Sequence, residues 1–177
     1  MRVLVLGIGN VMFADEGFGV HMALLLEQNY SFSKANSSVD FMDGGTLAHH
    51  LLHIIANYEQ LILIDCISAD GAKPGQLYSF DYENIPSHIN FQGSAHEIEM
   101  LQALSMMQMH GDLPKTRIFG VVPLRIAGMS FKISSKLQDA AIILEKEFLA
   151  FMKDLGFSYS KKDDKNIASI AASWELA

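Results

Sequence analysis

Cysteine is almost absent from the chain, which has one, Cys66, among its 177 residues. A single cysteine excludes an internal disulfide framework and every zinc or iron–sulfur site built from several cysteines. A metal ion bound by this chain would therefore take its ligands mainly from the 20 acidic residues and the seven histidines.

Basic residues are also scarce, because 13 Lys and Arg stand against 20 Asp and Glu, a net charge of −7. Without a basic run, nucleic acid is not expected as a partner, since binding it requires clustered positive charge. No long apolar run is present either. The run from Leu61 to Ile67 is interrupted by Asp65, and none approaches the ~20 residues of a membrane span. We expect a cytoplasmic protein without a membrane partner.

Hydrophobic residues make up 50% of the chain, and they gather in short runs that alternate with helical patterns. Such alternation predicts right-handed crossovers and a mainly parallel sheet covered on both faces. The prediction is an α/β fold with a five-stranded, mostly parallel sheet sandwiched between helices. The expected strands are 2–6, 39–42, 60–64, 116–122 and an edge strand within 76–82, and the expected helices are 17–28, 46–58, 94–109 and 134–155.

The domain organisation is expected to be one domain over residues 1–157 and a C-terminal appendage over 158–177. Ile167, Ile170 and Trp174 fall at helical spacing in this appendage. A segment that either docks on the core or frays is favoured over a role in binding a partner.

Acidic residues end or follow three consecutive expected strands, and a histidine lies near the start of a helix. Asp15 and Glu16 follow the first strand, Asp43 follows the second, Asp65 ends the third, and His96 opens the helix expected from Ser94. Ligands of an open parallel sheet bind beyond the carboxyl ends of its strands. The sequence therefore indicates a functional site at this edge of the sheet.

Two interpretations of this edge compete. Gly7-Ile8-Gly9 begins like a dinucleotide fingerprint, but Met12 stands at the third glycine position and Asp15 and Glu16 would repel a phosphate. The other interpretation is a cation site of Glu16, Asp65 and His96, whose mixed oxygen and nitrogen donors suit zinc, nickel or a similar ion. A purely structural role also stays open, with Asp65 capping loop amides and Asp15 or Glu16 capping the next helix.

Two weaker candidates lie elsewhere. His49 and His53 are four residues apart on an expected helix, but His50 occupies the place of the glutamate that a zinc-protease HExxH helix needs. A polar helix face is the favoured interpretation. Cys66 stands between Asp65 and apolar Ile67, where an inert buried thiol is favoured over a nucleophile.

Taken together, these motifs resemble the maturation endopeptidases of nickel–iron hydrogenases over about residues 1–155. Two local departures are Gly128-Met129-Ser130-Phe131, where the family more often has a Leu-Ser step, and the tail after Gly156. The motifs that carry the resemblance are Gly7-Ile8-Gly9-Asn10, Asp15-Glu16-Gly17-Phe18-Gly19, Asp43-Gly44-Gly45-Thr46, Asp65 and Ser94-Ala95-His96-Glu97.

The resemblance implies a twisted sheet and an endopeptidase that removes the C-terminal extension of the hydrogenase large-subunit precursor after nickel insertion. It implies that Glu16, Asp65 and His96 hold the metal, with Glu16, Asp65 and Asp43 as the residues proposed for catalysis. Either the metal or a carboxylate such as Asp43 would activate the attacking water, and Asp43 could instead position the substrate. The nickel would arrive with the substrate, and zinc or cadmium could occupy the same site. We expect a monomer. The alternative is a non-hydrolytic nickel-binding chaperone or assembly scaffold that uses the same ligands.

Overall fold

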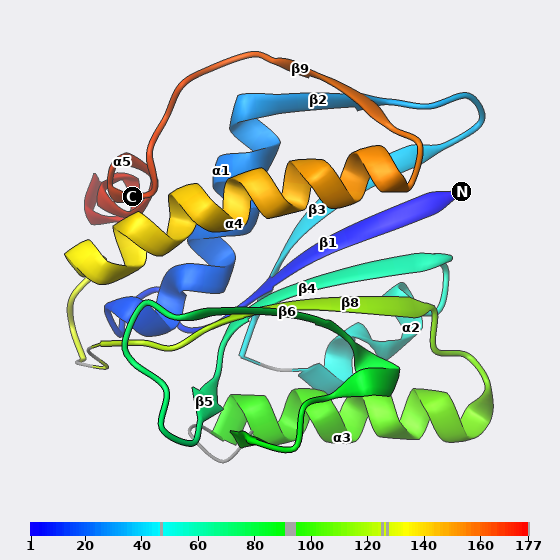
Figure 1. The fold of residues 1–177 in the computed structure, drawn as a ribbon, viewed down its shortest axis with the longest axis horizontal. Helices are drawn as coiled ribbons and strands as arrows, with labels where there is room; N and C mark the ends of the chain where they lie inside the picture. The colour runs from blue at the N-terminus through cyan, green and yellow to red at the C-terminus, as the bar shows by residue number, and fades with distance from the viewer. Residues whose placement is uncertain (47, 91–94, 125, 127, 177) are drawn as a thin grey trace.

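The computed structural model describes residues 1–46, 48–90, 95–124, 126 and 128–176, with the backbone alone for 48, 49, 90, 95–98 and 176. Its main sheet has five strands in the order β3-β1-β4-β8-β6 (Figure 1). These are β1 (Arg2–Ile8), β3 (Ser38–Gly45), β4 (Gln60–Cys66), β6 (Leu77–Asp81) and β8 (Lys115–Val121). Two small antiparallel pairs join β2 (Tyr30–Ser33) to β9 (Ser158–Lys161) and β5 (Ser68–Ala69) to β7 (Ile89–Asn90).

The helices alternate with these strands along the chain. They are α1 (Phe18–Asn29), α2 (Leu52–Ile55), α3 (Ala95–His110), α4 (Ser135–Asp154) and α5 (Ile167–Ser173). Short 3₁₀ segments are η1 (Asp15–Gly17), η2 (Ala48–Leu51), η3 (Tyr82–Asn84) and η4 (Trp174–Leu176). No helix of the described chain combines the length and the apolar character needed to cross a membrane.

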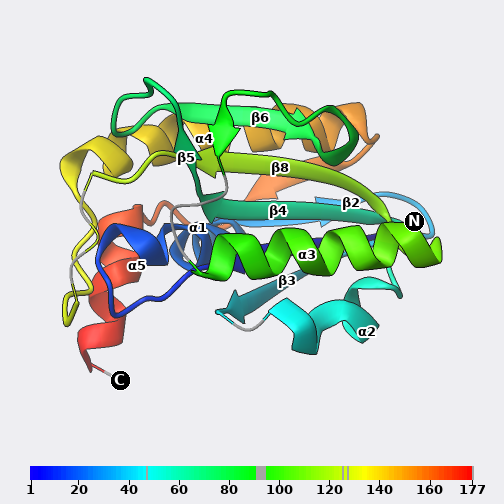
Figure 2. The same cartoon turned by 90° about the horizontal axis from the view of Figure 1, so that it is seen from below.

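The predicted fold class is confirmed. Four strands of the main sheet are parallel, and β6 lies at one edge and runs antiparallel to β8. Helices cover both faces, with α1, α4 and α5 on one and α2 and α3 on the other (Figure 2). Because strand side chains alternate between faces, Val3 and Val5 of β1 join the α1–α4 core and Leu4 and Leu6 join the α3 core.

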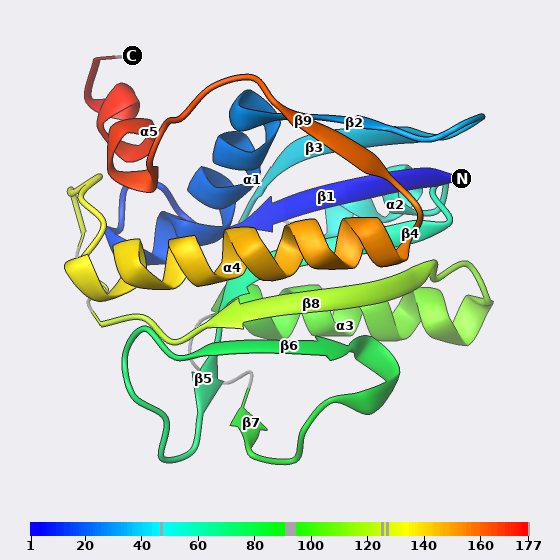
Figure 3. The same ribbon diagram turned by 45° about the horizontal axis from the view of Figure 1, so that its top comes forward.

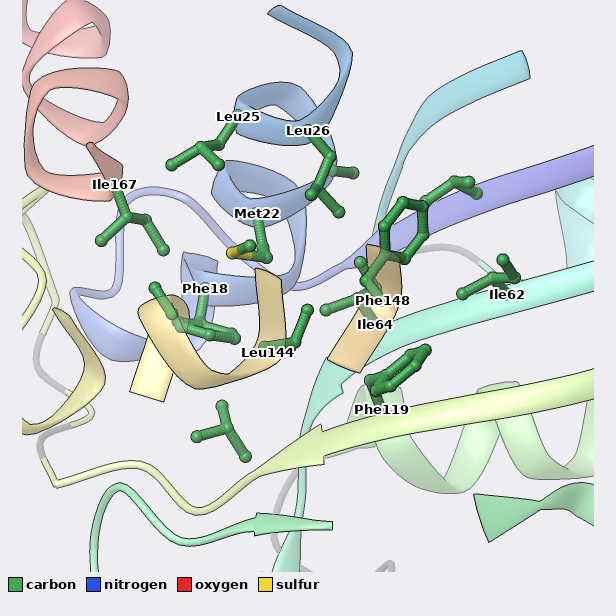
Figure 4. Packing of buried hydrophobic residues seen from close by; sticks show 14 of the residues in the cluster. Phe18, Met22, Leu25, Leu26, Ile62, Ile64, Phe119, Leu144, Phe148 and Ile167 are labelled. Atoms are coloured by element: carbon green, nitrogen blue, oxygen red, sulfur yellow. The ribbon is translucent and has the colours of Figure 1, made fainter. Parts of the chain in front are cut away.

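The larger core lies between α1, α4 and the sheet. Figure 4 shows Phe18 and Met22 of α1 turned toward Leu144 of α4, with Ile64 of β4 and Phe119 of β8 to their right. All five side chains are at most 1% exposed. Burial of this kind contributes roughly 1.5–3 kcal/mol per large apolar side chain, and it fixes α1 against the carboxyl end of β4.

The helix expected over 46–58 is wrong in extent. The chain forms η2 and then only a four-residue α-helix, α2. The side-chain amide of Asn57 donates to the carbonyl of His53 at 2.6 Å, while the Asn57 backbone N–H bonds the nearer carbonyl of Ile54 at 3.1 Å. Asparagine competes in this way for helix hydrogen bonds, and the helix ends there.

The C-terminal residues pack on the main body of the chain (Figure 3). β9 pairs with β2, and Ile167, Ile170 and Ala171 of α5 are buried in the larger core. Of the two alternatives that the sequence left open for this segment, docking and fraying, these contacts agree with docking. The division at residue 157 stays a prediction.

Candidate functional site

The carboxyl ends of β3, β1 and β4 lie side by side, so the sheet brings together the acids that lie at these ends or follow them. Gly7 of β1 is in register with Asp43 of β3 on one side and with Ile64 of β4 on the other. Asp65 is the next residue after Ile64. At about 4.8 Å per strand, the backbones of Asp43 and Asp65 are roughly 10 Å apart.

Glycine allows η1, which carries Glu16, to sit directly on the end of β1. Gly9 has φ +141°, and a Cβ there would lie 1.9 Å from the Glu16 carbonyl oxygen. Gly9 also donates its N–H to the Gly45 carbonyl at 2.9 Å, joining the ends of β1 and β3. No other residue fits such a backbone conformation and such a close approach. The glycine motif therefore serves to position Glu16.

Asp65 and Glu16 lie on segments that contact each other. The Cys66 thiol, next to Asp65, donates a hydrogen bond to the Asp15 carbonyl, next to Glu16, at 3.0 Å. Asp65 Oδ1 accepts the Cys66 backbone N–H at 2.7 Å. Asp65 is 7% exposed and Glu16 is 9% exposed. Two nearly buried carboxylates on adjoining segments offer hard oxygen donors, which makes this corner of the sheet a candidate site for a cation.

Asp15 has a different role, which the sequence did not reveal. Its side chain is fully buried, and its two oxygens accept the backbone N–H groups of Leu124 at 3.0 Å and Ser134 at 2.7 Å. Its carboxylate thus does not cap α1, which was one alternative from the sequence. Instead it fixes the segment that leads from β8 into α4, directly beside Glu16.

Asp43 lies at the end of β3 and is exposed. Its Oδ1 accepts the backbone N–H of Gly45 at 2.8 Å. It lines a pocket of about 290 Å³ whose other walls come from α1, from β3 and from Trp174. Asp43 is therefore solvent-accessible, in contrast to Glu16 and Asp65.

His96 is the second residue of α3, and its side chain lies outside the described residues, as does Ser94. Among the side chains that the structure describes, no three of His, Cys, Asp and Glu gather closely enough to hold a metal ion. The ligand set of Glu16, Asp65 and His96 therefore stays a prediction.

The histidines near α2 and the cysteine of β4 are not members of the proposed ligand set. His50 and His53 are exposed, and the side chain of His49 lies outside the described residues. The expected four-residue spacing on one α-helix does not hold, because His49 and His50 fall in η2 and His53 in α2. Cys66 is 3% exposed, in agreement with an inert buried thiol.

His21 of α1 escaped the sequence analysis. It is fully buried, and neither ring nitrogen has a hydrogen-bond partner within the described part of the chain. Burial lowers the pKa of His21 from 6.5 to about 4, so the ring is neutral at pH 7. Trp174 packs against it edge-to-face, with the ring centroids 6.4 Å apart. The spacing of His21 from Phe18 and Leu25, which marks the inward face of α1, was the available signal.

Exposed apolar side chains gather on two loops beside η1. Ala14 and Ser130 are joined by a 2.7 Å backbone hydrogen bond, and Ser130 and Met12 by one of 3.0 Å. An exposed apolar patch of this kind is typical of a protein-binding surface. Its large exposed members are Met12, Phe13, Leu124, Ile126 and Met129.

Comparison with known proteins gives one consistent result. The family model described as "HycI: Hydrogenase maturation protease" matches residues 20–150. The protein HydD of Wolinella succinogenes is 42% identical over 153 residues, which cover 86% of this chain and 96% of that protein. The hydrogenase 2 maturation protease of Escherichia coli is 35% identical over 124 residues, which cover 70% of this chain and 74% of that protein.

Solved structures agree with the sequence relatives. The hydrogenase maturating endopeptidase HybD from Escherichia coli matches with a TM-score of 0.81 and 28% identity, over 93% of this chain and 100% of that one. The NiFe hydrogenase maturation protease HybD from Thermococcus kodakarensis matches with a TM-score of 0.60 and 27% identity, over 83% of this chain and 99% of that one.

Proposed function

Because the chain belongs to the hydrogenase maturation protease family, we propose that it recognises nickel already held by its substrate, through Glu16, Asp65 and His96. The chain is an endopeptidase, and its family acts on the C-terminus of the hydrogenase large-subunit precursor. Family membership favours hydrolysis over the non-hydrolytic nickel chaperone. The proposal assigns the residues of this chain that recognise nickel and cleave the precursor, and it places nickel insertion before cleavage.

The observation that carries the proposal is the pair of buried carboxylates on η1 and at the carboxyl end of β4. Glu16 and Asp65 are each at most 9% exposed, and the hydrogen bond from Cys66 to Asp15 joins their segments. Carboxylate oxygens are hard donors and an imidazole is a borderline one. With a single, buried cysteine in this chain, the soft thiolate ligands of the nickel belong to the substrate.

The three residues act by fixing the precursor rather than by storing a metal. A nickel ion bound there supplies Lewis-acid polarisation and a fixed point near the scissile bond. Glu16 and Asp65 hold that point rigidly, because Gly9 seats η1 on β1 and Asp15 anchors the neighbouring loop. Positioning of this kind can supply a large part of a reduction in barrier.

Asp43 is proposed to take a proton from the attacking water. Its backbone lies roughly 10 Å from that of Asp65 along the sheet edge, so Asp43 stands outside the proposed set of metal ligands. Its exposed side chain is reachable by water and by an extended peptide. A general base must come within hydrogen-bond reach of the water in the complex.

The surface beside the site suits a protein partner. The apolar patch of Met12, Phe13, Leu124, Ile126 and Met129 stands next to η1, where it can contact the body of the large subunit. Burying such side chains at an interface stabilises a complex.

The experiment is mass spectrometry of the large-subunit precursor after incubation with the purified protein. The nickel-loaded precursor should lose a C-terminal peptide, and the nickel-free precursor should stay intact. Equal shortening of both would contradict recognition of nickel, and shortening of neither would contradict the processing of this precursor.

A further inference from the structure

The open edge of the main sheet borders a groove. β3 is an edge strand, paired with β1 only among the described strands. β2 and β3 leave the turn at 34–37 together, but β2 diverges to pair with β9 (Figure 1). Alternate backbone groups of β3 therefore face away from the sheet, and an unprotected edge of this kind readily accepts another strand.

Two pockets lie along this edge and share Glu27 and Phe41. The first, of about 290 Å³, is lined by apolar Val20, Ala23 and Leu24 of α1 and closed at one side by Trp174. It also borders Asp43 at the end of β3. An apolar pocket with an aromatic wall suits an apolar side chain.

The second pocket, of about 340 Å³, continues the groove toward the start of β3. Its lining is polar, with Ser31 of β2 and the acids Glu27 and Asp40, and with Lys162 as its one basic residue. The Lys162 ammonium donates to the Glu27 backbone carbonyl at 2.9 Å rather than to a carboxylate. Glu27 and Asp43 thus give the groove an excess of negative charge over Lys162. The Asp40 carboxylate interacts with Tyr58 on the opposite face of the sheet and does not add to this charge.

The groove matches an extended peptide in length and periodicity. It follows β3 from Val39 to Asp43, which corresponds to about 13 Å of strand at ~3.3 Å per residue. Alternate side chains of a strand point to the same face. A peptide added to β3 can therefore direct successive side chains of that face into the two pockets.

We propose that the β3 edge binds the C-terminal segment of the substrate as an added strand, with an apolar side chain against Trp174 and a basic side chain beside Glu27. Main-chain hydrogen bonds to β3 supply affinity, and the two pockets supply selectivity. Charge complementarity between an acidic groove and a basic residue favours the correct partner and speeds association. The inference rests on the proposed function, because the groove ends at Asp43.

Trp174 thereby becomes a specificity-determining residue. It lies outside residues 20–150, which match the family model, so selection of the substrate would involve a part of the chain beyond the shared protease region. Burial of Ile167 and Ile170 holds α5 on α1 and keeps the indole at the pocket.

Trp174 is the only tryptophan of the chain, so its emission reports directly on the pocket. A tryptophan-free synthetic peptide that spans the precursor's processing site should shift this emission in a saturable way. Hydrogen exchange of the full protein with the precursor should show slower exchange of the amides of Val39, Phe41 and Asp43. Unchanged emission together with unchanged exchange of β3 would overturn the proposal.

Two substitutions separate the groove from the chemistry. Leu24→Trp fills the apolar pocket from α1 and leaves α5 in place, and it should raise KM for the precursor about tenfold at nearly constant kcat. Glu27→Lys should raise KM roughly threefold or more, with a smaller effect at high salt. The matched controls are Ile143→Trp and Glu147→Lys on the exposed face of α4, and both should keep the wild-type KM.

Failure of this inference differs from failure of the proposed function. If the wild-type protein shortens nickel-loaded precursor and both groove variants keep the KM of their controls, the groove does not bind the substrate. If the wild-type protein shortens no precursor, the proposed function fails. The emission of Trp174 and the exchange of β3 then still decide whether the groove binds the peptide.

Discussion

The Asp15 carboxylate accepts the backbone N–H of Ser134 at 2.7 Å, across 119 positions of sequence. Ser134 is the N-cap residue of α4. The other Asp15 oxygen accepts the backbone N–H of Leu124, a member of the exposed apolar patch. One buried side chain thus joins η1, the loop after β8 and the start of α4. Because Glu16 is the next residue in η1, these hydrogen bonds also restrict its position.

Asp15→Ala is expected to lower the free energy of unfolding by about 3 kcal/mol, because two partly buried N–H groups lose a charged acceptor that is itself fully buried. Processing of the precursor should fall as well, since Glu16 loses its support. Denaturant unfolding measures the first effect, with Asp112→Ala, an exposed loop residue, as the control expected within about 0.5 kcal/mol of wild type. Equal stability of the two variants would contradict the role of Asp15.

Gly9→Ala tests the close approach of η1 to β1. Its Cβ would overlap the Glu16 carbonyl at 1.9 Å and would also impose a strained φ of +141°. We expect a loss of stability above about 3 kcal/mol, against about 1 kcal/mol for Gly111→Ala, which has a positive φ but open space around it. Thermal or denaturant unfolding of both variants gives the comparison. A loss in Gly9→Ala no larger than in Gly111→Ala would show that the contact with Glu16 is unimportant.

His21 should make stability depend on pH. Its pKa is lowered from 6.5 to about 4 in the folded protein, so between these values the unfolded state binds a proton that the folded state does not. The free energy of unfolding therefore falls as the pH decreases through this window, by about 3 kcal/mol in the acid limit. His21→Leu should remove this contribution. Urea unfolding of the wild-type protein and His21→Leu at about pH 7 and about pH 5 tests this contribution. An equal change in the free energy of unfolding between the two pH values in both proteins would exclude His21 as the cause.

Cys66 is expected to have no role in the chemistry. Its thiol is 3% exposed and bonds the Asp15 carbonyl. Cys66→Ala should process nickel-loaded precursor at close to the wild-type rate and lose about 1 kcal/mol of stability. Iodoacetamide should label the folded protein slowly and the urea-unfolded protein quickly. Fast labelling of the folded protein with loss of processing would identify a reactive thiol instead.

The sequence predicted the central strands well because each is a continuous apolar run. β1 and β4 are buried on both faces, and each has a glycine or an aspartate, Gly7 or Asp65, just before its last residue. Neither signal depends on distant residues. The position of the site followed from strand order, since the carboxyl ends of parallel strands share one edge.

The rest depends on contacts far apart in the chain. β2 and β9 are four residues each and pair across more than 120 positions, so local pattern alone does not reveal them. The function of Asp15 could not be read from the sequence for the same reason, since its partners follow it by 109 and 119 positions. The Trp174 pocket likewise needs α5 to fold back on α1.

The most direct test of the account is the mass of the precursor after incubation with ligand variants. Glu16→Gln and Asp65→Asn keep the size of the side chain and remove the negative charge of the proposed nickel ligand, and His96→Ala removes the imidazole ring. With nickel-loaded precursor, each should leave the C-terminal extension in place under conditions where the wild-type protein and Asp112→Asn remove it. Removal of the extension at the wild-type rate by these folded variants would contradict the assignment of Glu16, Asp65 and His96.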